Sequence, residues 1–204
     1  MGELFKSLHK FDEASHCYEK AANLASGSHE SETVNRELAR LLTAQGDYPE
    51  ALKAFKRLRE NDNSIYTQTS MATVLRKMGS LQSARQLYES VYLENKSHHQ
   101  ALVGLAEINR QKGRFRKAIT KYETAIGMLS HDADSAKIYR CALSSLHCAT
   151  GRYDEAESLL RELLQQYGND WKIQLSLAKV LRLEGKLLEA GQLYRDSFLS
   201  LIHI

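Results

Sequence analysis

The stretch QGDYPEALKAF at residues 45–55 decides the fold, because five other segments of the chain repeat its pattern. Each copy has an alanine near its middle, and the six alanines follow one another at steps of 37, 33, 34, 38 and 34 residues. A period near 34 residues is typical of proteins built from helical repeats. The other copies are LHKFDEASHCY (8–18), MGSLQSARQLY (78–88), KGRFRKAITKY (112–122), TGRYDEAESLL (150–160) and EGKLLEAGQLY (184–194).

When the six copies are aligned, each set of equivalent positions forms a column, and several columns hold similar residues. The alanine column consists of Ala14, Ala51, Ala84, Ala118, Ala156 and Ala190. A glycine stands five residues before the alanine in every copy except the first, which has His9. An aromatic residue or leucine stands four residues after it, and a small residue stands twelve before it. The small residues are Gly2, Ala39, Ala72, Ala106, Ser144 and Ala178.

These columns predict helical hairpins. Each glycine follows apolar residues at helical spacing, as in VNRELARLLTAQ (34–45), and can end that helix in the left-handed conformation. A second helix then begins at once, since Asp47 can cap its free N–H groups and Pro49 fits its first turn. The small residues and the alanines let the two helices approach closely.

With these columns, residues 1–198 resemble the tetratricopeptide repeat family. The proline that often closes such a repeat and the tryptophan near its start are both missing. The resemblance implies an all-α, right-handed superhelical solenoid of about six helix-turn-helix repeats, the first one truncated. Its first helices would line a concave groove that holds a peptide or a partner helix. The predicted repeats form one array, at about 1–28, 32–64, 65–98, 99–135, 137–169 and 171–198.

Two steps in the array are longer than the others. The extra residues fall at SGSHE (26–30) and LSHDADS (129–135). They either lengthen a loop or add a turn of helix, and no domain boundary is predicted at either place.

The resemblance also implies which side chains line the groove, because residues thirteen, ten, six, three and two positions before the turn glycine face it in such repeats. These positions hold nine basic and two acidic residues, whereas the whole chain carries a net charge of only +3. Concentrated basic charge favours an acidic partner, although basic side chains also cover helix surfaces without a ligand. The candidate groove residues are Arg36, Arg40, Tyr66, Thr69, Thr73, Arg76, Lys77, Glu107, Arg110, Lys172, Lys179 and Arg182.

The function predicted from this groove is that of a scaffold or adaptor that binds a protein or peptide. The family's two-carboxylate clamp is not reproduced: Arg36 and Arg40 stand at its first pair, but Ser70, Gln100 and Gly104 stand at the positions that follow. One alternative is a regulatory or substrate-docking segment of a larger, truncated enzyme such as a transferase. Binding of single-stranded RNA is disfavoured, because Tyr66 is the groove's only candidate for base stacking.

No catalytic, metal or cofactor site is predicted. The sequence lacks GxGxxG, P-loop, GxSxG and HExxH motifs. Cys141 and Cys148 could form a redox or metal pair on one helix face, but small groove-lining residues are the favoured interpretation. Three cysteines without a CxxC pair fit a reducing compartment, so we expect a cytoplasmic protein without a membrane segment. The oligomeric state stays open.

The tail LSLIHI, residues 199–204, departs from the pattern. Four of its six residues are apolar, whereas a terminal repeat needs a polar outer face. The tail also resembles the translation of a common transposase sequencing adapter. We therefore expect residues 199–204 to be non-native and the natural chain to continue past Phe198.

Overall fold

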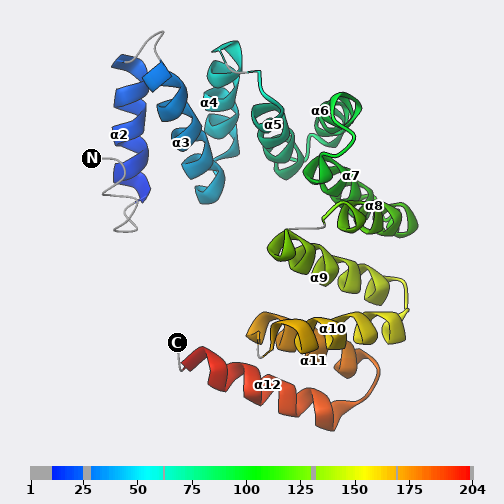
Figure 1. Ribbon diagram of the computed structural model, residues 1–204. Helices are drawn as coiled ribbons and strands as arrows, with labels where there is room; N and C mark the ends of the chain where they lie inside the picture. Colours follow the sequence, from blue (N-terminus) through cyan, green and yellow to red (C-terminus); the bar gives the residue numbers. More distant parts are fainter. Residues whose placement is uncertain (1–10, 25–28, 62, 130–131, 169, 203–204) are drawn as a thin grey trace. The chain divides into compact units, whose positions relative to one another are not determined.

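The computed structural model describes residues 11–24, 29–61, 63–129, 132–168 and 170–202, and within these ranges it holds α-helices and no strands (Figure 1). The predicted all-α class is therefore confirmed. The helices are α2 (Phe11–Leu24), α3 (His29–Gln45), α4 (Tyr48–Asn61), α5 (Ile65–Lys77), α6 (Leu81–Glu94), α7 (His99–Gln111), α8 (Phe115–Gly127), α9 (Ala133–Ala149), α10 (Tyr153–Tyr167), α11 (Trp171–Leu183) and α12 (Leu187–Ile202).

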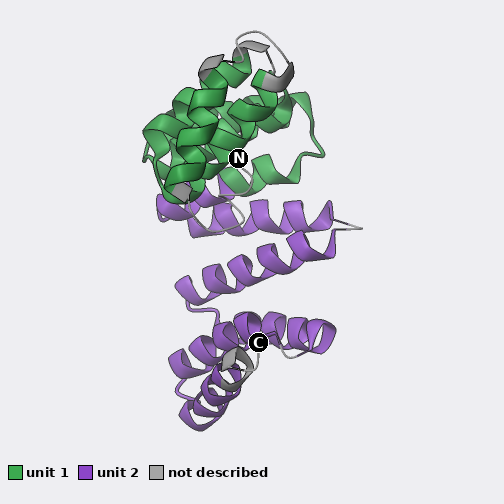
Figure 2. Cartoon of the chain, turned by 90° about the vertical axis from the view of Figure 1, so that its left-hand side faces the viewer, with its two compact units in different colours: residues 1–104 green, residues 105–204 purple. Residues whose placement is uncertain are grey.

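The chain divides into two compact units, residues 1–104 and residues 105–204 (Figure 2). In the first unit α3 packs against α2 and α4, and α5 packs against α4 and α6. In the second unit α9 packs against α8 and α10, and α11 packs against α10 and α12. Within each unit, helices that follow one another along the chain thus pack side by side, as in a repeat protein.

The small and alanine columns lie in the interior, as predicted. All six column alanines are buried, and so are the small residues of the first helices from Ala39 to Ala178. The large residues of the columns fill the space around them, for example Phe55 and Leu38 in the first unit and Leu160 and Leu177 in the second. Gly2 lies outside the described residues.

The turn chemistry follows the predicted pattern in part. The five turn glycines have positive φ angles between 67° and 87°, which confirms the left-handed helix ends. The Asp47 carboxylate caps α4 by accepting from the Glu50 N–H at 3.4 Å. The Glu50 side chain pairs with Lys53 one turn later in the same helix. Gly168 also has a positive φ, of 65°, and ends α10 at a position that the repeat columns do not mark.

The two longer steps are accommodated by longer first helices. α3 and α9 have 17 residues each, whereas α5, α7 and α11 have 13. Since a helical turn takes 3.6 residues, the additional length is about one turn. Of the two possibilities for these steps, the structure therefore shows the added turn. At the other end, α12 runs to Ile202, and the origin of the tail stays a prediction.

Ion pairs connect α10 to the beginning of α12. The Glu157 carboxylate accepts from the Lys186 ammonium at 2.6 Å and from Arg161 Nε at 2.6 Å, and Arg161 also binds Glu189. The hydrogen bonds that the Glu157 carboxylate accepts from Lys186, first, and from Arg161 lower its pKa from 4.5 to about 2. A lowered pKa in the folded state stabilises the fold at pH values above the unfolded pKa.

We therefore expect Glu157→Gln to weaken the acid sensitivity of the fold. In the wild type the contribution of Glu157 is complete above pH 4.5 and is lost as the pH falls toward 2. The variant should be less stable than the wild type at neutral pH, and the difference between their free energies of unfolding should shrink as the pH falls from 4.5 toward 2. Urea unfolding at several pH values in this range measures the difference. Glu162→Gln, on an exposed side of α10, is the control. A gap that is independent of pH would contradict the prediction.

Candidate partner-binding surface

The candidate groove residues lie on the first helices of the hairpins, as expected from their spacing. α3 carries Arg36 and Arg40, and α7 carries Glu107 and Arg110. The remaining candidates are Tyr66, Thr69, Thr73, Arg76 and Lys77 on α5 and Lys172, Lys179 and Arg182 on α11. Counted by the same spacing from His9, the first repeat contributes the groove positions Glu3, Lys6 and Ser7, which lie outside the described residues.

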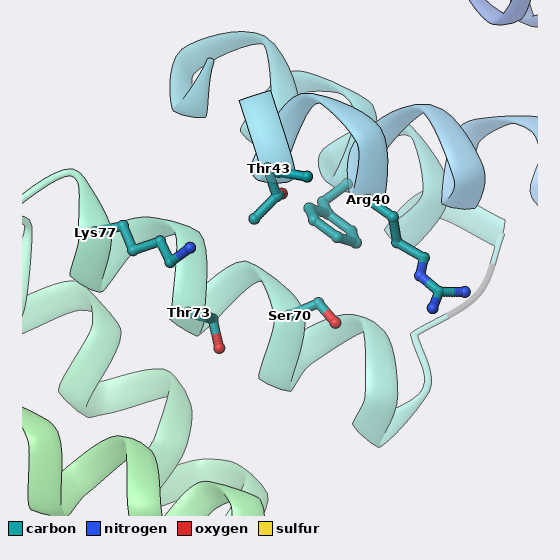
Figure 3. A pocket seen from close by; sticks show the side chains of 7 residues that line it. Arg40, Thr43, Ser70, Thr73 and Lys77 are labelled. Carbon is teal, nitrogen blue, oxygen red and sulfur yellow. The ribbon is translucent and has the colours of Figure 1, made fainter. Parts of the chain in front are cut away.

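A pocket in the first unit brings some of these residues together. It has a volume of about 280 Å³ and lies between α3 and α5, with Phe55 of α4 among its lining residues. Arg40 and Lys77 lie at opposite ends of it, and Thr43, Ser70 and Thr73 lie between them (Figure 3). Of the twelve candidates, three therefore share one pocket: Arg40, Thr73 and Lys77.

Other candidates on α3 and α5 are less accessible than expected. Thr69 is only 7% exposed, and its hydroxyl donates to the Ile65 carbonyl at 2.7 Å. Thr69 is therefore largely covered, and its place in a binding groove stays a prediction. Arg36 and Arg76 are half-buried, and Tyr66 is 44% exposed.

Acidic side chains on the same helices compensate part of the basic charge. Arg40 pairs with Glu37 at 3.1 Å, and Glu37 does not occupy a predicted groove position. Arg110 forms a two-pronged ion pair with Glu107 whose shortest N–O distance is 2.6 Å, and this hydrogen bonding raises the pKa of Arg110. The count of basic groove residues therefore overstates the positive charge that a ligand meets.

Tyrosines of the second helices hold groove residues by hydrogen bonds. The Tyr88 hydroxyl lies 2.8 Å from the Thr73 hydroxyl, and the Tyr122 hydroxyl donates to Glu107. In both pairs the groove residue stands 15 positions before the tyrosine. The buried tyrosines thus position groove side chains as well as filling the core.

The second unit has a pocket of its own, of about 450 Å³, between α9 and α11. Lys137 and Asp170 form an ion pair of 3.2 Å at this pocket, and the Lys172 ammonium lies 5.5 Å from the centroid of the Trp171 ring. Among its lining residues, Lys172 alone belongs to the candidate set. Lys137 and Trp171 were missed because both stand fourteen residues before a turn glycine, one position outside the predicted groove spacing.

The surroundings of Cys141 and Cys148 disfavour a reactive thiolate. Cys141 and Cys148 are half-buried free thiols, and burial raises the pKa of each. A raised pKa disfavours the reactive thiolate. Across the described ranges, no group of His, Cys, Asp and Glu side chains is suited to a metal ion, and no helix is long and apolar enough to cross a membrane.

Comparison with known proteins identifies relatives of this repeat pattern. The family model described as "Tetratricopeptide repeat" matches residues 1–64 and 97–169. The curated protein "Cellulose synthase 1 operon protein C" of Komagataeibacter xylinus is 25% identical over 170 residues, which cover 75% of this chain and 12% of that protein. The chain thus spans only a small part of this relative's length.

Solved structures share the fold. A tetratricopeptide repeat protein from Parabacteroides merdae superimposes with a TM-score of 0.73 at 18% identity, over 97% of this chain and 76% of that one. Yeast Tom70 superimposes with a TM-score of 0.72 at 19% identity, over 91% of this chain and 39% of that one. At such identities the similarity shows the fold alone, which confirms the predicted all-α repeat solenoid.

Proposed function

The chain belongs to the tetratricopeptide repeat family, and from this premise we propose that it binds a peptide or partner helix along the basic surface of its first helices. Repeats of this family generally mediate contacts between proteins and are generally non-catalytic. The observation that carries the proposal is the pocket between α3 and α5, which is lined by Arg40 and Lys77 and by no carboxylate. A surface of this charge favours an acidic partner and speeds its association.

The other predicted functions have less support. The comparisons do not favour a regulatory segment of a larger enzyme over a scaffold. Binding of RNA would need several aromatic side chains on which bases can stack. Among the candidate groove residues on α3 and α5, Tyr66 is the one aromatic residue. A cytoplasmic location remains part of the proposal, since the described cysteines are free thiols.

Selection from a displayed library of random peptides tests this proposal. We expect the chain to enrich peptides that bind it in solution and that shift the amide resonances of α3 and α5 around Arg40, Thr73 and Lys77. The proposal fails if no selected peptide binds, or if the shifts fall only on second helices such as α4. Labelled single-stranded RNA serves as competitor, and RNA that binds more tightly than the peptides would also overturn it.

A further inference from the structure

The pocket between α9 and α11 in the second unit differs in composition from the pocket between α3 and α5. Its volume is about 450 Å³, and its lining contains two aspartates and two lysines whose formal charges cancel: Asp134, Lys137, Asp170 and Lys172. The lining also contains large apolar side chains, namely Ile138, Trp171 and Ile173. A charge-neutral pocket of this size with apolar walls can hold one large side chain of a partner.

The apolar part of this pocket is accessible from outside. Ile138 is 62% exposed, and Trp171 is half-buried at the beginning of α11. Ile173, by contrast, is only 1% exposed and belongs to the core of the second unit. The core therefore continues into an exposed apolar surface at the pocket. Tryptophan is also among the residue types that contribute most to binding at protein interfaces.

Contacts among the polar side chains hold the wall of the pocket in place. The Lys137 ammonium lies 3.2 Å from the Asp170 carboxylate and 5.0 Å from the centroid of the Tyr167 ring. Asp170 also accepts from the Lys172 backbone N–H at 2.9 Å and thereby caps α11. The Tyr167 hydroxyl donates to the Ala133 carbonyl at 2.9 Å and joins the end of α10 to the beginning of α9. Because these contacts exist without a ligand, binding requires little additional ordering.

The balanced charges of the lining favour an uncharged aromatic occupant. An acidic side chain would meet the carboxylates of Asp134 and Asp170, and a basic one would meet the ammonium groups of Lys137 and Lys172. An aromatic ring can pack against the Trp171 ring, and its face attracts a neighbouring ammonium group. The Lys172 ammonium is already placed beside an aromatic ring, 5.5 Å from the centroid of Trp171. An aliphatic side chain would gain from burial alone.

We propose that this pocket is an anchor site for a neutral aromatic side chain, such as phenylalanine, of a bound peptide. The assignment rests on the proposed function, and it names a feature of the partner's sequence. It depends on neither a carboxylate of the partner nor a basic clamp, and Lys137 and Trp171 stand one position outside the groove spacing of the family. Because the charges of the lining cancel, binding here depends little on salt, in contrast to binding along the basic surface.

Trp171 is the only tryptophan of the chain, so its fluorescence reports on this pocket. The probes are short acetylated and amidated peptides of serine and glycine with phenylalanine, leucine, glutamate or lysine at the centre. We expect the phenylalanine peptide to shift the Trp171 emission to shorter wavelength with a Kd on the order of 1 mM. It should bind at least about threefold more tightly than the leucine peptide and about tenfold more tightly than the charged peptides. Its Kd should change less than about twofold when the salt concentration is raised tenfold.

Substitutions at the pocket have a matched control on α12. Ile138→Ala should weaken binding of the phenylalanine peptide about fivefold through lost apolar contact. Leu188→Ala, which shortens a 93% exposed leucine of the same unit, should leave the affinity unchanged. Trp171→Ala should weaken binding at least about tenfold, whereas Trp171→Phe keeps a ring and should retain most of the affinity. For the Trp171 variants the shifts of the α9 and α11 amide resonances replace the fluorescence signal.

The anchor site is overturned if the phenylalanine peptide changes neither the Trp171 emission nor these amide resonances at about 10 mM, ten times the expected Kd. Equal or tighter binding of any other probe peptide, or unchanged affinity in either Ile138→Ala or Trp171→Ala, would also overturn it. A single-stranded oligouridine that binds the pocket more tightly would assign it to nucleobases instead. The proposed function fails separately, when the displayed library yields no binder. Library peptides that shift α3 and α5 would retain the function even where the phenylalanine peptide leaves Trp171 unchanged and the anchor site falls.

Discussion

Replacing Gly104 with alanine should lower the free energy of unfolding by about 2 kcal/mol, the middle of the range for overpacked cores. A β-carbon at this position of α7 would lie 2.2 Å from Cζ of Tyr88, far inside van der Waals contact. The Tyr88 ring is 2% exposed, and its hydroxyl contacts Thr73, so the ring cannot move aside without breaking other contacts. This strain outweighs the roughly 1 kcal/mol that alanine gains over glycine in a helix. Urea unfolding monitored by circular dichroism measures the change.

A second helical glycine provides the control for this prediction. Gly127 ends α8, and a β-carbon there would meet no heavy atom within 4 Å. Gly127→Ala should therefore be neutral or slightly stabilising. In a Tyr88→Leu background, which removes the ring, Gly104→Ala should cost less than it does alone. Equal costs in both backgrounds would show that the approach of Tyr88 to Gly104 is not the cause.

The fold was predictable because one steric rule recurs in each repeat. The six column alanines are all buried and the five turn glycines all have positive φ, so several copies report the same constraint. Features that occur once left no such pattern. Gly168 ends α10 outside the columns, and the contact between Gly104 and Tyr88 depends on the orientation of one ring in a neighbouring hairpin. The longer repeat steps were visible in the sequence, but the sequence could not indicate whether a loop or the helices α3 and α9 take up the extra residues.

The candidate site was predictable only at the level of helix faces. Spacing placed Arg40, Thr73 and Lys77 on first helices, and the structure joins them in one pocket. Spacing could not indicate the pairing of Arg40 with Glu37, because that depends on side-chain conformation within a turn. The lining role of Phe55 was also missed, since the predicted groove positions all lie on first helices and Phe55 lies on α4.

Reversing two charges on α3 should abolish binding of an acidic peptide. Arg36 and Arg40 lie one helical turn apart, and Arg40 lines the pocket. Arg36→Glu with Arg40→Glu replaces two attractive charges by two repulsive ones beside Glu37, and like charges across an interface cost several kcal/mol. We expect the affinity for the library-selected peptides to fall at least about a hundredfold. Helicity and melting should change little, because like-charge pairs on an exposed helix cost only about 0.2–0.5 kcal/mol each.

The matched control reverses two charges with the same spacing on the second helix of the same hairpin. Lys53→Glu with Arg57→Glu makes an equal change in net charge and breaks a comparable ion pair, that of Lys53 with Glu50. If the first-helix surface is the binding site, this control should retain most of the affinity, apart from a salt-dependent loss from the altered net charge. Equal losses in both double variants would mean that only the overall charge of the chain attracts the peptide. If binding is undiminished after reversal at Arg36 and Arg40, these arginines do not contribute to binding, and the peptide binds at another surface.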